Sequence, residues 1–177
     1  FVEAIWDSGG TDTIDLSNFV EACSISLVPG TYSTIVCNGW TMVDNLGIAH
    51  GTIIENVIGG NGNDTILGNE TDNLINGGNG NDILTGGLGL DHFNFSANFG
   101  TDTVTDFSLT QDLLTFIDEA GVEIDSALVT ETNNDAGDVV LTVPNGSSVT
   151  LTGISSYNSF SPLLSGNIVS NFDVALE

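Results

Sequence analysis

The chain has 177 residues, of which 24 are Asp or Glu, none is Lys or Arg and two are His, giving a formal net charge of −24. This length is enough for one domain with a sizeable core. Without basic side chains no ordinary ion pair can form, and binding to nucleic acid, anionic membranes or anionic polysaccharides is disfavoured.

Carboxylates brought together without counter-charge repel one another and resist removal from water. A compact state of this chain therefore requires cations from solution. A solubilising acidic surface, as in salt-adapted proteins, would also explain the charge. It would not explain why the acids recur in phase with glycine between residues 59 and 94.

Short apolar runs separated by Gly, Asn, Asp and Thr, with almost no helical periodicity, predict an all-β fold. The chain opens on 1–6, which reads as the middle of a strand and suggests a C-terminal piece of a longer protein. No apolar run reaches the length of a spanning helix, and the N-terminus lacks a leader pattern. Further strands are predicted before the repeats at 13–16, 24–27 and 52–54.

The cysteines of this first region, Cys23 and Cys37, are the only two in the chain. They could form one disulfide in an oxidising compartment. Two buried thiols are an equal alternative, because two cysteines are too few to indicate a disulfide framework.

From residue 59 to residue 94 the chain repeats itself every nine residues, with Gly-rich turn residues in slots one to six and a short strand in slots seven to nine. Glu55 and Val57 continue the phase one unit upstream. Slot six holds Asp64, Asn73, Asp82 and Asp91, and slot eight holds Ile66, Ile75, Leu84 and Phe93.

Two such units make one coil of a flattened helix, so alternate units stack about 4.8 Å apart, as in any sheet. Ile66 is then expected over Leu84, and Ile75 over Phe93, filling a narrow interior. The nine-residue period matches the calcium-binding repeat of RTX proteins.

The stacked turns are expected to be 59–64 with 77–82 at one edge, and 68–73 with 86–91 at the other. Each pair presents backbone carbonyls and slot-six side chains, and calcium takes about six to eight oxygens of these kinds. No thiolate or imidazole cluster accompanies the turns, which disfavours soft metals. A Gly-rich solenoid whose Asn and Asp only form turns is the alternative; a P-loop is excluded because Lys and a following helix are missing.

After the repeats, strands are predicted at 102–107 and 113–116, with one short helical turn within 112–128. The clearest hairpin joins 138–143 to 148–152 through Asn145-Gly146. No linker is long enough to divide the chain.

Segments 5–17 and 48–60, which read IWDSGGTDTIDLS and IAHGTIIENVIGG, together with the repeats resemble the C-terminal domain of serralysin-type metalloproteases. The likeness is specific over 1–107 and looser beyond. It implies a parallel β-roll of nonapeptide repeats flanked by antiparallel β-sandwich-like strands, with several Ca²⁺ ions and an uncleaved type I secretion signal near the C-terminus. One domain is expected over 1–177, made of flanking strands (1–58), repeats (59–94) and a C-terminal β region (95–177).

The resemblance also implies three groups of metal-binding residues. The first lies between the stacked turns of one edge, the second between those of the other edge, and the third around the 7–12 loop. The first group is Gly60, Gly62, Asp64, Gly77, Asn79 and Asp82, and the second is Asn69, Thr71, Asn73, Gly86, Leu88 and Asp91. The third group is Gly10, Asp12, Ile53 and Glu55. Asp7 and Gly9 would share a further ion with residues upstream. An outer site at Asp82 with Asp102 or Asp106 is a weaker expectation.

The peptidase zinc signature His-Glu-x-x-His is absent. His50 is expected to have a structural role, since one imidazole makes no zinc site, and His92 is expected to be an exposed strand residue. The implied function is a non-catalytic calcium-binding module of a secreted, extracellular protein. It would fold on binding calcium and support the type I secretion and stability of an attached protease domain, with a type I exporter as partner.

Two other functions are weighed. One is a structural or adhesive module of an extracellular matrix or surface assembly that self-associates through strand edges. The other is an enzyme using Asp7 and Asp12 as acid and base for glycoside cleavage, which is disfavoured because acids bracketing Gly-Gly beside such repeats are more often ligands. Residues 171–177 are a candidate export tail of acids and apolar residues.

Overall fold

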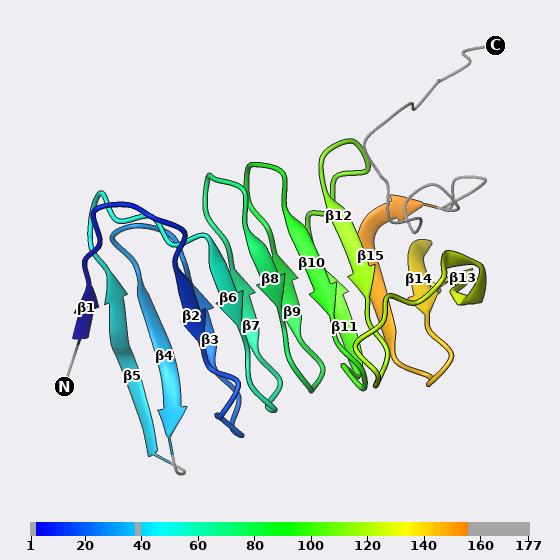
Figure 1. Ribbon diagram of the computed structural model, residues 1–177, viewed down its shortest axis with the longest axis horizontal. Coiled ribbons are helices and arrows are strands. Elements are labelled where there is room, and N and C mark those ends of the chain that lie inside the picture. Colours follow the sequence, from blue (N-terminus) through cyan, green and yellow to red (C-terminus); the bar gives the residue numbers. More distant parts are fainter. Residues whose placement is uncertain (1–2, 38–39, 156–177) are drawn as a thin grey trace.

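The computed structural model describes residues 3–37 and 40–155, and the side chains of these residues except 37 and 40–42. Short strands lie side by side along the long axis of the molecule in two layers (Figure 1). In this part of the chain no helix has the length and apolar character needed to cross a membrane. The strands are β1 (Glu3–Ile5), β2 (Thr13–Asp15), β3 (Ser24–Ser26), β4 (Tyr32–Cys37), β5 (Trp40–Ile48), β6 (Asn56–Ile58), β7 (Thr65–Leu67), β8 (Leu74–Asn76), β9 (Ile83–Thr85), β10 (His92–Phe95), β11 (Thr101–Val104), β12 (Leu113–Phe116), β13 (Thr130–Asn133), β14 (Asp138–Thr142) and β15 (Ser148–Ser155), with one 3₁₀ turn, η1 (Ser126–Leu128).

The strands form two sheets, one in the order β1-β5-β4-β3-β7-β9-β11-β15-β14-β13 and the other in the order β12-β10-β8-β6-β2. From β6 to β11 the chain alternates between the sheets, and every pairing within this part is parallel. Antiparallel strands extend the larger sheet on both sides, as β3-β4-β5 and as β15-β14-β13. The predicted all-β class, a parallel roll with antiparallel flanks, is confirmed.

The interior of the roll is built from the slot-eight side chains. Ile66 lies opposite Leu84, and Ile75 opposite Phe93, as predicted. Residues from the flanking coils extend both rows, and each is at most 7% exposed. Burying one such side chain contributes roughly 1.5–3 kcal/mol. The rows are Ile14, Val57, Ile75, Phe93 and Leu114 in one sheet, and Ile25, Ile66, Leu84, Val104 and Leu151 in the other.

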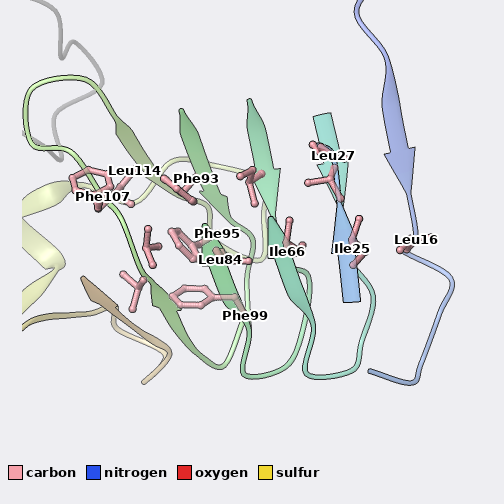
Figure 2. Packing of buried hydrophobic residues seen from close by; sticks show 14 of the residues in the cluster. Leu16, Ile25, Leu27, Ile66, Leu84, Phe93, Phe95, Phe99, Phe107 and Leu114 are labelled. Atoms are coloured by element: carbon pink, nitrogen blue, oxygen red, sulfur yellow. The ribbon is translucent and has the colours of Figure 1, made fainter. Parts of the chain in front are cut away.

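Phenylalanines fill the interior near the C-terminal end of the roll, as Figure 2 shows for Phe93, Phe95, Phe99 and Phe107. The ring centroids of Phe95 and Phe99 are 5.0 Å apart, and those of Phe95 and Phe116 are 5.2 Å apart. These rings lie where the coil grows longer: contacts between equivalent turn residues span 18 positions in the repeats but 20 and 21 beyond them. The extra residues widen the coil, and large side chains fill the added space.

The prediction of a strand at 52–54 is wrong, because the strand is β6 at Asn56–Ile58. Glu55 occupies slot six of the repeat phase, so the preceding residues form the turn edge and strand pairing begins only after it. Apolar composition suggested a strand there, but Thr52 and Ile54 are buried as parts of a turn.

The β4–β5 hairpin was not predicted from the sequence, because it lies outside the nine-residue repeats. The other strand predictions hold within a few residues, as β2, β3, β11 and β12. The hairpin of β14 and β15 turns at the predicted place, where Gly146 has φ +94°. The short helical turn expected within 112–128 is η1.

Candidate calcium-binding edges

At one edge of the roll, slot-six carboxylates tie each turn to the next. The Asp64 N–H donates to Asp82 Oδ1 (2.7 Å), and the Asp82 N–H donates to Asp102 Oδ1 (2.8 Å). The Asp64 carboxylate in turn accepts the N–H groups of Gly60 and Cys23, each at 2.7 Å. Asp64, Asp82 and Asp102, here called the Asp64 ladder, are at most 1% exposed.

The other edge carries a second series, here called the Asn73 ladder, formed by Asn73, Asp91 and Asp112. The Asn73 N–H donates to Asp91 Oδ1 (2.9 Å), and the Asp91 N–H donates to Asp112 Oδ1 (3.1 Å). Asp112 Oδ2 accepts the N–H of Ser108 at 2.7 Å. These side chains are also buried, and the ladder differs from the first in beginning with a neutral amide.

Burial shifts the pKa values of these carboxyl groups upward. Desolvation raises the pKa of Asp82 to about 7 and that of Asp102 to about 8, against the opposing effect of the backbone N–H donors. It also raises the pKa of Asp91 to about 6, and nearby acids add to the shift. The ionised form of each group is therefore disfavoured unless a cation lies beside it.

Two oxygens of the Asp64 ladder lack a partner. Asp82 Oδ2 and Asp102 Oδ2 are buried and accept no hydrogen bond within the described part of the chain. Buried carboxylate oxygens are normally satisfied, and the sequence offers no Lys or Arg to do so. The residues of this edge thus fit a cation.

The carbonyls expected as further ligands lie at the same edges. Gly60 O accepts the N–H of Asn79 (2.9 Å), and Asn69 O accepts the N–H of Leu88 (3.0 Å). A carbonyl has two lone pairs, so each oxygen keeps one for a metal. Within the described part, no three His, Cys, Asp or Glu side chains form a metal-binding group on their own. Any ion at these edges would therefore depend on such carbonyls, which suits calcium.

Glycine in slot one allows the turn to close over its own slot-six side chain. A Cβ atom added to Gly77 would overlap the Asp82 carboxylate, and one added to Gly86 would overlap that of Asp91. Gly80, in slot four, has φ +135°, which favours glycine. The recurrence of glycine in phase with the acids is thereby explained.

The first and second groups of predicted ligands are brought together in the expected pairs of turns. Turn 59–64 lies against turn 77–82, and turn 68–73 against turn 86–91. Thr71 and Gly62 lie within these turns. The Leu88 side chain is a hydrocarbon and is 66% exposed, so only the backbone carbonyl of Leu88 could act as a ligand.

The third group also converges. The Asp12 N–H donates to Glu55 Oε2 (2.8 Å), and the Asp7 N–H donates to Thr52 Oγ1 (3.2 Å). Asp7 Oδ2 accepts the N–H of Gly9 at 2.6 Å. Gly10 would place a Cβ 3.3 Å from Asp12 Oδ2, and Ile53 is 44% exposed on the neighbouring turn.

Asp12 is the acid at the centre of this third group. Desolvation, then Asp7 and then Glu55 raise its pKa, and its Oδ2 accepts no hydrogen bond. These acids lie close together without a basic partner. Because they form no metal-binding group on their own, an ion here would also need carbonyl oxygens, as at the other edges.

The outer acids are divided between the edges. Asp102 lies beside Asp82, whereas Asp106 accepts the N–H groups of Gly86 (2.9 Å) and Gly87 (2.8 Å) at the other edge. Asp112 was not among the sequence candidates. The nine-residue phase slips after the fourth repeat, and only counting a coil of 21 residues from Asp91 would have found Asp112 as the continuation of the Asn73 ladder.

The histidines lie apart from each other in the fold. The His50 ring packs over Gly30, where a Cβ would overlap it, in line with a structural role. His92 is in strand β10, but the expectation that it is exposed is wrong. It is half-buried, its Nε2 lies 2.7 Å from Thr115 Oγ1 of the neighbouring strand β12, and burial lowers its pKa.

Two predictions fall outside the described residues. The side chain of Cys37 is one of them, so the two alternatives for Cys23 and Cys37, one disulfide or two thiols, both stay predictions. The candidate export tail at 171–177 is the other.

Comparison with known proteins identifies a matching family and several relatives. The family described as the serralysin C-terminal region of M10 peptidases matches residues 1–171. Serralysin G of Dickeya chrysanthemi is 44% identical over 72 residues, which are 41% of this chain and 14% of that protein. Metallopeptidase AprA of Pseudomonas marginalis is 42% identical over 74 residues, 42% of this chain and 15% of AprA.

Serralysin of Proteus mirabilis is 44% identical over 72 residues, covering 41% of this chain and 14% of that protein. Among solved structures, the extracellular lipase LipA from Serratia marcescens aligns over 84% of this chain and 18% of the lipase, with 26% identity and a TM-score of 0.49. The alignments thus span about one seventh of each of these proteases. By its match over residues 1–171, the chain belongs to the serralysin C-terminal family of M10 peptidases.

Proposed function

We propose that this chain is a non-catalytic calcium-binding module of a secreted protein, and that it folds when calcium binds outside the cell. The observation that carries the proposal is the Asp64 ladder, whose buried carboxylates have no basic partner anywhere in the sequence. Asp82 and Asp102 need either a proton or a metal ion to remain buried.

Calcium is the cation that suits the edges best. The stacked turns offer carboxylate and carbonyl oxygens, which are the ligands of hard cations. Magnesium demands a nearly regular octahedron and gives up its water reluctantly, so it fits two flexible turns less well. One ion is placed between turns 59–64 and 77–82, a second between turns 68–73 and 86–91, and a third at Asp12 and Glu55.

Coupling of binding to folding follows from mass action. The stacked turns exist only in the folded chain, so calcium adds RT ln(1 + [L]/Kd) per site to the stability. For a site with Kd about 10⁻⁴ M, within the range of extracellular modules, about 1 mM calcium adds roughly 1.4 kcal/mol. Several sites together make folding depend on the ion. Where free calcium is scarce, repulsion among the acids keeps the chain unfolded.

The relatives suggest what the module is attached to. They are named serralysin or metallopeptidase, and this chain aligns with only 14–15% of their length. We therefore place the module beside a protease domain, with export of the unfolded chain through a type I exporter and stabilisation of the protease after calcium-driven folding. This attachment favours the protease module over an adhesive or matrix module.

Circular dichroism during a calcium titration tests the coupling. The chain is first depleted of calcium with EDTA at pH 8 and then titrated with CaCl₂, with MgCl₂ as the matched control. The expected result is a steep gain of β signal at millimolar calcium or below, with little response to magnesium. A chain equally rich in β-structure with EDTA at pH 8 would refute the coupling.

A secretion assay tests the second half of the proposal. A passenger protease domain fused to this chain should appear in the medium only when a type I exporter is co-expressed. Export of the passenger without the chain, or failure of export with it, would contradict the assigned role.

A further inference from the structure

One junction between successive coils differs from the others in chemistry. It is the place where turn 68–73 meets the backbone of Ile54 and Glu55, on the side facing away from turn 86–91. Both residues offer carbonyl oxygens to this junction, and slot six of the upstream unit is Glu55. At the other junctions a carboxylate accepts a backbone N–H of the neighbouring coil, as Asp82 does from Asp64, but here amide nitrogens donate to carbonyls.

Two asparagine side chains, Asn69 and Asn73, donate hydrogen bonds into this junction. Asn69 Nδ2 donates to Ile54 O (2.8 Å) and lies 3.4 Å from Leu27 O. Asn73 Nδ2 donates to Glu55 O (3.1 Å) and lies 3.5 Å from Ile54 O. Both side chains are buried, at 5% and 2% exposure.

The oxygen atoms of the two amides are also engaged. Asn69 Oδ1 accepts the N–H and the hydroxyl of Thr71, at 2.9 and 2.8 Å. Asn73 Oδ1 accepts the N–H of Asn69 at 2.8 Å. This network fixes the orientation of each amide, with nitrogen toward the carbonyls and oxygen toward its own turn.

The sequence of the four repeats sets this turn apart. Slots two and six hold glycine with aspartate in the other three units, but asparagine at both places in this one. The pairs are Gly60 and Asp64, Asn69 and Asn73, Gly78 and Asp82, and Gly87 and Asp91. The pair of amides therefore occurs in the unit that lies against the carbonyls of Ile54 and Glu55, the second of which also accepts the N–H of Leu74 (3.0 Å).

We propose that the carboxamides of Asn69 and Asn73 take the place of a cation at this junction, which closes without calcium. A carbonyl carries partial negative charge and is satisfied equally by a metal ion or by an N–H donor. On its other side the same turn still faces Asp91 across the second calcium site. This inference rests on the proposed function only in that calcium binds the other junctions.

The test compares the number of calcium ions bound by the wild type and by the double variant Asn69→Asp/Asn73→Asp. The substitutions remove both donors and add two carboxylates against the carbonyls of Ile54 and Glu55. Equilibrium gel filtration in calcium-containing buffer, with atomic emission, counts the ions. Asn18→Asp/Thr132→Asp is the matched control, because it adds the same charge at two exposed positions.

The expected result is one more bound ion per chain in the double variant than in the wild type, and no extra ion in the control. An unchanged count in the double variant overturns the proposal, because a cation would then already occupy the junction. A wild type that binds no calcium would instead refute the proposed function. The two failures are thus distinguishable.

If the double variant does not fold at any calcium concentration, the single variant Asn69→Gly provides the test of the proposal. This change restores the glycine of the other repeats and removes the shorter of the two amide contacts to Ile54 O, leaving the one from Asn73 Nδ2 at 3.5 Å. The expected result at saturating calcium is an unchanged ion count and a Tm lower by about 2–4 °C. Loss of one bound ion in Asn69→Gly would show that Asn69 holds a cation, and would overturn the proposal.

Discussion

The two edges of the roll are built on one nine-residue pattern, yet they begin differently. The Asp64 ladder begins with a buried carboxylate, which accepts N–H groups of Gly60 and Cys23. The Asn73 ladder begins with an amide that both accepts an N–H and donates to the carbonyl of Glu55. A carboxylate can only accept hydrogen bonds when ionised, so it leaves neighbouring carbonyls unsatisfied, whereas an amide satisfies them itself. On our proposal, the residues in slots two and six decide whether a junction needs an ion.

The largest expected effect is the pH dependence of the calcium-free chain. Asp91, Asp82 and Asp102 have pKa values raised to about 6, 7 and 8, from an ordinary value of 3.8. The folded state binds more protons than the unfolded state between these values, so the stability is present in full below about pH 4 and is lost as the pH rises to about 8. Thermal unfolding followed by circular dichroism in calcium-depleted buffer measures the loss.

A variant sharpens this prediction. Asp102→Asn removes the group with the highest pKa and should flatten the decline above pH 7. Asp15→Asn, at an exposed acid whose pKa is lowered, should leave the curve unchanged. A calcium-free chain that is equally stable at pH 5 and pH 8 would contradict the desolvation argument.

The next largest effect distinguishes the calcium-free form of the Asp64 ladder from its calcium-bound form. Asp82→Asn keeps an acceptor for the Asp64 N–H but removes the charge, so the calcium-free state should become more stable while calcium binding weakens. Loss of a charged contact costs about 1.5–3 kcal/mol, so the Kd of calcium at this site should rise about tenfold or more. Unfolding in calcium-free buffer measures the change in stability, and a calcium titration measures the change in calcium affinity. Weakened calcium binding with a destabilised calcium-free state would argue for a purely structural Asp82.

A smaller effect is expected at the other edge, where a carboxylate caps two backbone N–H groups. Asp106 accepts the N–H groups of Gly86 and Gly87 from an exposed position. Asp106→Ala removes this cap and should lower the free energy of unfolding at saturating calcium by about 1 kcal/mol. Urea unfolding measures the change. A loss no larger than that of an exposed control such as Asp135→Ala would show that solvent replaces the cap.

The smallest effect is expected on the outer face of the roll. The hydroxyls of Thr85 and Thr105 lie 2.7 Å apart near the solvent. Thr85→Val should change the free energy of unfolding by at most about 0.5 kcal/mol, as is usual for surface substitutions. The same urea unfolding serves as the measurement. A larger loss would mean that this face contributes to stability as the edges do.

Much of this architecture could be predicted from the sequence, because the repeat is short and its phase is unbroken. The pairings of Ile66 with Leu84 and of Ile75 with Phe93 followed from stacking alternate units. The convergence of Asp64 with Asp82, and of Asn73 with Asp91, followed from the same step. A repeat period that determines which side chains face one another also determines which turn residues meet at each edge of the roll.

The remaining sequence-based predictions failed where the nine-residue phase changes, or where packing between residues far apart in the sequence determines burial and hydrogen bonding. Asp112 was missed because its coil is longer than two repeats. The burial of His92 depends on the neighbouring strand β12, which local pattern does not reveal. The donor role of Asn69 was also missed, because it depends on the carbonyl of Ile54, which is 15 positions away.

A crystal structure of the chain grown in calcium, with anomalous scattering data, tests the central claim most directly. We expect anomalous peaks at the edges of the roll, beside the carboxylates of Asp64 and Asp82 and beside that of Asp91. No peak is expected between the amide of Asn69 and the carbonyl of Ile54. Edges bridged only by water, in a roll that keeps its shape, would contradict the account.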